Sequence, residues 1–169
     1  MKLFFAAVIL LFAPAFAHAA EAEVNTEFTI NSSLEKTIRF VENNPKQLRE
    51  AAGIELIKDL GDGNFKVKRE SAKGTFIWIM KEEIENKDGI YRYKSKLVES
   101  IEGGIEKSDT DIIIQTNRDH IIVSLKISAV VNNGRVKTTG LRIDLKNKVD
   151  RVKRLLQSNL EKDYPNLNR

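Results

Sequence analysis

The spacing of apolar residues predicts a long amphipathic helix at the C-terminal end of the chain, over Thr138 to Lys162. On a helical wheel its apolar residues fall within an arc of roughly 100° and form one stripe. They are Leu141, Leu145, Val149, Val152, Leu156 and Leu160. At about 1.5 Å per residue, the segment from Thr139 to Leu160 would be about 33 Å long, enough to cross a small domain. We therefore expect this helix to cover the core.

Seven other segments alternate apolar and polar residues or form short apolar runs, which predicts β-strands. They are Glu23–Ile30, Ile54–Asp59, Phe65–Glu70, Thr75–Glu85, Ile90–Glu99, Ile105–Thr116 and His120–Val131. Turn sequences such as Asp62-Gly63 and Asp88-Gly89 join consecutive strands, so we expect an antiparallel sheet. The first half of Thr75–Glu85 is apolar in both alternating sets of positions, which predicts that both of its faces are covered or that it carries a bulge.

Two short helices are predicted between the first and second strands. Ser32 and Glu35 have the spacing of a capping box, in which both side chains bind backbone N–H groups of the first turn. Asn44 and Pro45 end this helix and begin the next, because proline is tolerated at the first helical position. Gly53 is expected to end the second helix.

This element order resembles the helix-grip fold of the START-like superfamily, also called SRPBCC, which includes polyketide cyclase-like proteins. The resemblance covers nearly all of Glu23 to Lys162 and rests on element order and turn placement, with no residue motif behind it. It implies an α+β fold: a curved antiparallel sheet of about seven strands, two short helices after the first strand, and a long C-terminal helix packed across the sheet. Members mostly bind lipids, sterols, polyketides or other hydrophobic molecules in a cavity between sheet and helix, and some are enzymes. A cystatin-like or cone-shaped fold is the main rival, but such folds usually place their long helix early.

The first twenty residues have the features of a secretory signal peptide. Lys2 precedes an apolar run from Leu3 to Phe16, and Ala17-His18-Ala19 forms an A-x-A cleavage pattern. An uncleaved membrane anchor is the alternative, but the run is shorter than the roughly 20 apolar residues of a membrane span. We therefore expect a signal peptide over residues 1–20 and one START-like domain over residues 21–169.

The amino-acid composition limits which cellular compartment and which classes of partner are expected. Cleavage would lower the formal net charge from +4 to +3, because the first twenty residues contain one lysine and no acidic residue. Basic and acidic residues are interspersed, whereas nucleic-acid binding calls for a concentrated basic surface, so no nucleic acid is expected. The chain contains no cysteine, which excludes disulfides and thiolate sites. An exported protein without disulfides fits the periplasm or exterior of a bacterium.

The sequence offers no catalytic, metal-binding or cofactor-binding motif. His120 is the only histidine after residue 20, and Asp109-Thr110-Asp111 lacks the spacing of a calcium loop. Glu82, Glu83 and Glu85 are paired carboxylates in principle, but we expect exposed positions that face Lys94 across a hairpin. A cyclase-type enzyme would need a polar pair inside the pocket, and the sequence names none.

Seven residues are the candidate ligand-binding site, placed between the long helix and the strands Thr75–Glu85 and Ile90–Glu99. Aromatic residues with polar tips suit a pocket for a mostly apolar molecule. The candidates are Trp78, Met80, Tyr91 and Tyr93 from the strands and Arg142, Leu145 and Val149 from the helix. Ordinary core packing is the alternative for the aromatic residues, and a bulge after Asn86 would reverse the facing of Tyr91 and Tyr93.

Basic residues flank the apolar stripe of the long helix. Arg142, Lys146 and Lys153 follow one edge, and Lys148 lies beyond the opposite edge. One interpretation is a solvated face whose long side chains cover the core edge. The other is a basic rim that faces an anionic head group or an acidic membrane surface.

The sequence thus favours an exported START-like protein that binds a hydrophobic or amphipathic small molecule such as a lipid. The alternative is an envelope protein-interaction module whose core is filled by its own side chains. A cyclase-type enzyme is the third hypothesis.

Overall fold

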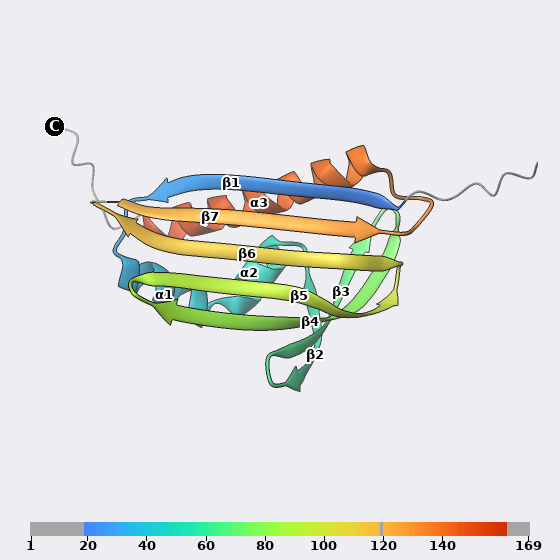
Figure 1. The fold of residues 1–169 in the computed structure, drawn as a ribbon, viewed down its shortest axis with the longest axis horizontal. Coiled ribbons are helices and arrows are strands. Elements are labelled where there is room, and N and C mark those ends of the chain that lie inside the picture. The colour runs from blue at the N-terminus through green and yellow to red at the C-terminus, as the bar shows by residue number, and fades with distance from the viewer. Residues whose placement is uncertain (1–18, 119, 162–169) are drawn as a thin grey trace, which may run out of the picture.

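The computed structural model describes residues 19–118 and 120–161 as one curved antiparallel sheet with three helices on its concave face (Figure 1). The sheet strands are β1 (Ala20–Ile30), β2 (Glu55–Gly61), β3 (Asn64–Ser71), β4 (Gly74–Lys87), β5 (Ile90–Glu102), β6 (Ile105–Asn117) and β7 (His120–Val131). The helices are α1 (Leu34–Asn43), α2 (Pro45–Ala51) and α3 (Thr138–Leu160). The predicted fold class and element order are confirmed.

The strands pair in the order β1-β7-β6-β5-β4-β3-β2, and each pairing is antiparallel. Strands β2 to β7 form a meander because tight turns join them. At two of these turns Asp62 and Asp88 have φ values of 50° and 54°, in the left-handed region, which asparagine, aspartate and glycine adopt most readily. The last strand, β7, pairs with the first strand, β1, which makes β1 and β2 the two edges of the sheet.

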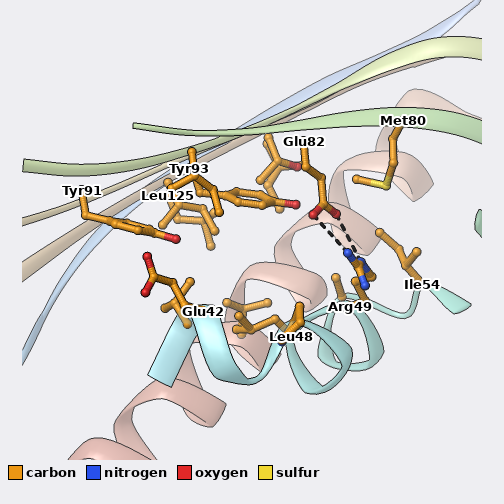
Figure 2. A pocket seen from close by; sticks show the side chains of 17 residues that line it. Glu42, Leu48, Arg49, Ile54, Met80, Glu82, Tyr91, Tyr93 and Leu125 are labelled. Atoms are coloured by element: carbon orange, nitrogen blue, oxygen red, sulfur yellow. Dashed lines mark hydrogen bonds and ion pairs between the residues drawn. The ribbon is translucent and has the colours of Figure 1, made fainter. Parts of the chain in front are cut away.

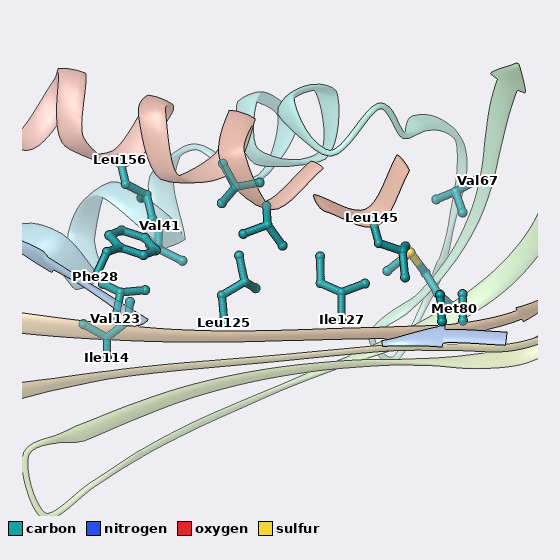
Figure 3. Packing of buried hydrophobic residues seen from close by; sticks show 14 of the residues in the cluster. Phe28, Val41, Val67, Met80, Ile114, Val123, Leu125, Ile127, Leu145 and Leu156 are labelled. Atoms are coloured by element: carbon teal, nitrogen blue, oxygen red, sulfur yellow. The ribbon is translucent and has the colours of Figure 1, made fainter. Parts of the chain in front are cut away.

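Helix α3 covers the β1–β7 side of the sheet (Figure 1). All six residues of its predicted apolar stripe are at most 7% exposed, and Leu145, Leu156 and Leu160 are each 1% exposed. On the facing strand, Leu125 and Ile127 lie beneath the helix (Figure 3). The predicted alternation of β7 is also confirmed, since its residues from Ile121 to Val131 in steps of two are all buried. Burial of this stripe joins the long helix to the sheet.

Helices α1 and α2 cover the other end of the concave face. The predicted cap of α1 is wrong by one residue: the N-cap is Ser33, whose Oγ accepts a hydrogen bond of 3.2 Å from the Lys36 N–H. Ser32 is buried instead. Asn44 and Pro45 separate the two helices as predicted, with Pro45 as the first residue of α2.

The pairing of β4 with β5 settles which way their side chains face. The register shifts opposite Ile77–Trp78 and Ile79–Met80 place the extra residues, Ile101 and Val98, in β5, so of the two predicted alternatives β4 itself carries no bulge. Its alternate residues Ile77 and Ile79 are half-buried. The register is then continuous to the turn, with no bulge after Asn86. Tyr91 and Tyr93 therefore share the concave face with Met80.

The predicted signal peptide, residues 1–20, lies outside the described residues except for its last two positions. Ala20 is the first residue of β1, where it pairs with Val131 and is 2% exposed. Within the described part of the chain, none of the helices combines the length and the apolar character that crossing a membrane requires.

Candidate ligand-binding site

Two cavities lie between the sheet and the helices. The first has a volume of about 130 Å³ and lies between α1, α2 and the middle of the sheet. Its apolar lining includes Val41, Leu48, Met80, Ile112, Leu125 and Val152. The second has a volume of about 250 Å³ and lies between the first half of α3, the β3–β4 hairpin and the ends of β6 and β7. Its apolar lining includes Phe76, Trp78, Ile105, Ala129, Leu141 and Leu145.

A short apolar boundary separates the two cavities. On β4, Trp78 lines the second cavity and Met80 lines the first. Val149 lines neither, is 2% exposed, and lies on α3 between residues that line the two cavities. Leu145 and Met80 point toward one another across the core (Figure 3). Side chains rather than backbone therefore divide the interior.

An ion pair lies inside the first cavity (Figure 2). Arg49 of α2 binds Glu82 of β4 through Nε–Oε1 and Nη2–Oε2 contacts of 3.2 and 3.1 Å, and both side chains are 12% exposed. The Arg49 guanidinium also lies 4.4 Å from the centre of the Phe65 ring. A bidentate pair of this kind fixes both planes, so α2 is held at a defined distance from the sheet.

Two tyrosines of β5 extend into the same cavity (Figure 2). Burial, followed by the charge of Glu82 and its hydrogen bond with the phenol, raises the pKa of Tyr93 far above its usual value. Burial, followed by the charges of Glu42 and Glu82, raises the pKa of Tyr91 to about 12. Both phenols are therefore neutral at physiological pH and able to donate a hydrogen bond.

The hydroxyl of Tyr91 has no hydrogen-bond partner among residues 19–118 and 120–161. Tyr91 is 0% exposed and lines the first cavity. A buried polar group without a partner costs about 1–3 kcal/mol, and such groups in native proteins usually have a specific reason. A ligand with a hydrogen-bonding group would remove this cost.

The second cavity contains a different polar cluster. Arg69 of β3 forms an ion pair with Oδ1 of Asp144, and Lys148 Nζ lies 3.9 Å from Oδ2 of the same carboxylate. Lys148 is 9% exposed. Burial is the main cause that lowers its pKa to about 7, and the nearby charge of Arg69 lowers it further while Asp144 opposes the shift. A buried ammonium group thus lies at the wall of an apolar space.

The predicted site residues fall around both cavities. Met80, Tyr91 and Tyr93 line the first, Trp78 and Leu145 line the second, and Val149 lies at the boundary. Arg142 lines neither: it is exposed on the side of α3 next to β1, in a shallow depression with Glu23 and Lys146. The apolar stripe itself lines both cavities, through Val152 in the first and Leu141 and Leu145 in the second, and Lys148 lines the second from the edge of the stripe opposite Arg142.

Sequence reasoning did not place Glu82 or Arg49 in these cavities, and it named Lys148 only among the basic residues that flank the apolar stripe. Glu82 was predicted to be an exposed strand position, but it faces the cavity because it has the same parity as Trp78 and Met80. Lys148 is only about 20° outside the apolar stripe on the helical wheel, which is a usable signal for its burial. Arg49 offered no signal, since its contact with Glu82 spans 33 residues of sequence.

Glu83 and Glu85 behave as predicted: Glu83 pairs with Lys94 in the β4–β5 register, and Glu85 forms an ion pair of 3.2 Å with Lys94. In the part of the chain that the structure describes, no group of three or more histidine, cysteine, aspartate or glutamate residues is arranged to hold a metal ion. The Arg49–Glu82 pair is a polar pair inside a pocket, but the two groups already bind each other.

Solved structures with a similar fold are known. No protein-family model and no curated protein matches the sequence. A START superfamily protein from Mycobacterium smegmatis has a similar structure, with a TM-score of 0.60 and 10% identity over 83% of this chain and 97% of that one. A STAR-related lipid transfer protein from Xanthomonas axonopodis aligns with a TM-score of 0.57 and 10% identity, over 79% of this chain and 85% of that one.

A plant protein has the same architecture. The major latex-like protein 151 from Panax ginseng aligns with a TM-score of 0.55 and 14% identity, over 83% of this chain and 98% of that one. At these identities the likeness concerns the fold. The chain has the START-like helix-grip fold.

Proposed function

We propose that this protein is exported and binds a hydrophobic or amphipathic small molecule between the sheet and the helices. The observation that carries the proposal is the buried Tyr91 hydroxyl, which has no partner in the described structure and lines an otherwise mostly apolar cavity. An apolar ligand body would cover Leu48 and Ile112, and a hydroxyl or carbonyl group would pair with Tyr91. Apolar contact supplies affinity in such a site, while the polar group sets orientation.

Cavity size indicates how much of a ligand each space accommodates. A cavity of about 150 Å³ holds benzene, and ordinary ligand pockets begin at about 300 Å³. The cavities of about 130 and 250 Å³ therefore each hold only part of a typical ligand. A longer molecule would extend through both after movement of Met80, whose unbranched side chain changes rotamer easily.

Two further observations support the proposal. A solved structure of similar fold is described as a lipid transfer protein. Export is supported by the apolar run from Leu3 to Phe16 and the Ala17-His18-Ala19 pattern. The proposed location is the periplasm or the exterior of a bacterium.

A fluorescence titration with neutral N-phenyl-1-naphthylamine tests the binding function. Ala52 lines the first cavity, so Ala52→Phe should fill it and weaken binding by about tenfold or more. Gln47 is exposed on α2, the helix that Ala52 caps, and lines neither cavity, so Gln47→Phe is the matched control. Equal affinity in the two variants would show that the probe does not use the first cavity.

Tyr91→Phe tests the polar contact. The variant should fold with unchanged or slightly higher stability, because it removes an unpartnered buried hydroxyl. It should lose affinity for a ligand that pairs with Tyr91, such as 1-naphthol, relative to naphthalene. An unchanged preference between these two compounds would contradict the role of Tyr91.

A protein-interaction module remains the second candidate function, and one observation favours it. Leu56, Ile57 and Leu60 of the edge strand β2 are 42%, 45% and 43% exposed. An exposed apolar edge strand is a surface on which another strand can add. If no apolar probe binds to the well-folded protein, this function takes precedence.

A further inference from the structure

We infer that the second cavity binds the carboxylate of a single-chain anionic amphiphile, with Lys148 as its contact and the apolar chain against Trp78. The inference deepens the proposed function and rests on the interior accepting an amphipathic ligand. It adds the charge of that ligand and its orientation in the fold.

The charges that line the second cavity are strongly unbalanced. Four basic residues and one acidic residue line it: Arg69, Lys73, Lys137, Lys148 and Asp144. Asp144 is engaged by Arg69, so one acidic group is shared between two buried or half-buried cations. Lys73 and Lys137 are exposed and lie toward the mouth, where they would attract an approaching anion. A ligand anion would neutralise the excess positive charge.

Lys148 has the position that such an anion requires. Lys148 is 9% exposed, and the distance of 3.9 Å between its Nζ and Asp144 Oδ2 exceeds hydrogen-bond length. Charged groups interact much more strongly in a poorly solvated interior than in water. Burial and Arg69 lower the pKa of Lys148 to about 7, which is the expected cost of an incompletely paired ammonium. A carboxylate beside it would remove that cost.

The first cavity has the opposite charge balance, which fixes orientation. It is lined by Glu42, Arg49 and Glu82, so acidic groups outnumber basic ones. A carboxylate there would meet repulsion, whereas a neutral hydrogen-bonding end would meet the Tyr91 hydroxyl. The anionic end of the ligand is therefore assigned to Lys148 and the chain is directed toward Met80.

The size of the charge excess favours a carboxylate over a phosphate monoester. With Arg69 paired to Asp144 and with Lys73 and Lys137 exposed, Lys148 is the remaining buried basic group of this cavity, and an adjacent carboxylate would favour its charged form. A phosphate monoester carries about −1.5 to −2 at neutral pH and would leave negative charge without a buried partner. One carboxylate matches one ammonium.

Titration of the complete mature protein with three probes tests the inference: decanoate, 1-decanol and acetate. The emission of Trp78 reports occupancy, since it is the only tryptophan and lines the second cavity. Decanoate should bind about tenfold or more tightly than 1-decanol, and acetate should not bind at the same concentrations. Tight binding of acetate would mean an anion site that does not need the chain.

Lys148→Met and Lys146→Met form the matched pair of variants. Lys146 is exposed on the same helix, whereas Lys148 is buried. Lys148→Met should lose the preference for decanoate while it binds 1-decanol within about twofold of the wild type, and Lys146→Met should change neither. Lys148→Met removes a buried charge and leaves an unbranched apolar side chain one atom shorter than lysine, so folding should be retained.

The outcomes separate this inference from the proposed function. If 1-decanol and decanoate bind equally, or if Lys148→Met keeps the preference for decanoate, the anion site is refuted and the apolar-ligand function stands. If neither chain-bearing probe changes the emission of Trp78 in the folded protein, the anion site is refuted, and the titration with N-phenyl-1-naphthylamine decides the apolar-ligand function.

Discussion

Replacement of Lys148 by methionine should stabilise the ligand-free protein, and the gain should depend on pH in a defined way. Lys148 is 9% exposed, and its pKa is lowered from 10.5 to about 7, mainly by burial. At roughly 1.4 kcal/mol per pKa unit, this corresponds to an upper bound of about 5 kcal/mol for the cost of the charged form. Replacing buried ionic groups with apolar side chains of similar size gains roughly 1–4 kcal/mol, and we expect a value in that range at pH 6.5.

The sign of the pH dependence follows from the two protonation states. Between about pH 7 and pH 10.5 the unfolded chain holds the Lys148 proton and the folded chain does not, so stability rises with pH. Below pH 7 both states are protonated and the destabilisation is fully present. The wild type should gain roughly 2 kcal/mol from pH 7 to pH 9 through this group. The gain should be absent from Lys148→Met.

Urea unfolding at several pH values measures this difference. The range should end at pH 9, because the raised pKa of Tyr91 and Tyr93 makes the folded state less stable once these groups ionise in the unfolded chain. Subtraction of the Lys148→Met curve from the wild-type curve removes titrations that the two proteins share. Parallel curves would show that the Lys148 ammonium is solvated in the folded protein, and the buried-charge argument would then fail.

Two other predictions concern the helix and the processing site. Leu156→Ala should reduce the free energy of unfolding by about 2–5 kcal/mol, since Leu156 is 1% exposed. The control Arg154→Ala, on the exposed side of α3, should change it by no more than about 0.5 kcal/mol. Equal losses in urea melts would contradict the buried stripe. Intact-mass measurement of the exported protein should find a first residue near Ala20 or Glu21, because Ala17-His18-Ala19 has the pattern of a cleavage site. A mature chain that retains Met1 would refute the signal peptide.

Local periodicity was enough to predict most of the architecture. The apolar stripe of α3 and the alternation of β7 are properties of single elements, so burial of one face follows from residue spacing alone. The turns at Asp62-Gly63 and Asp88-Gly89 joined neighbouring strands and thereby predicted the meander. The cap of α1 was misplaced by one residue because Ser32 and Ser33 have the same capping chemistry.

The chemistry of the interior depended on tertiary structure. Whether Tyr91 and Tyr93 face the core depended on an unbroken register after Asn86, which the sequence left open. Glu82 has the parity of the buried residues of β4, but its ionic partner inside the cavity is Arg49, 33 residues earlier in the sequence. Charged residues remain solvated unless elements distant in the sequence supply ionic partners or enclose them. The sequence of one strand or helix does not show which distant element will do so.

Lys148 shows the same division on one helix. Its wheel position placed it just outside the apolar stripe, as Arg142 is at the other edge, and spacing treats the two edges alike. In the folded protein the two edges differ. The edge with Arg142 lies beside the edge strand β1 and is exposed, while the edge with Lys148 faces β3 and the second cavity. The sequence determined that α3 has one buried face, and the asymmetric placement of α3 over the sheet decided which flanking cation is buried with it.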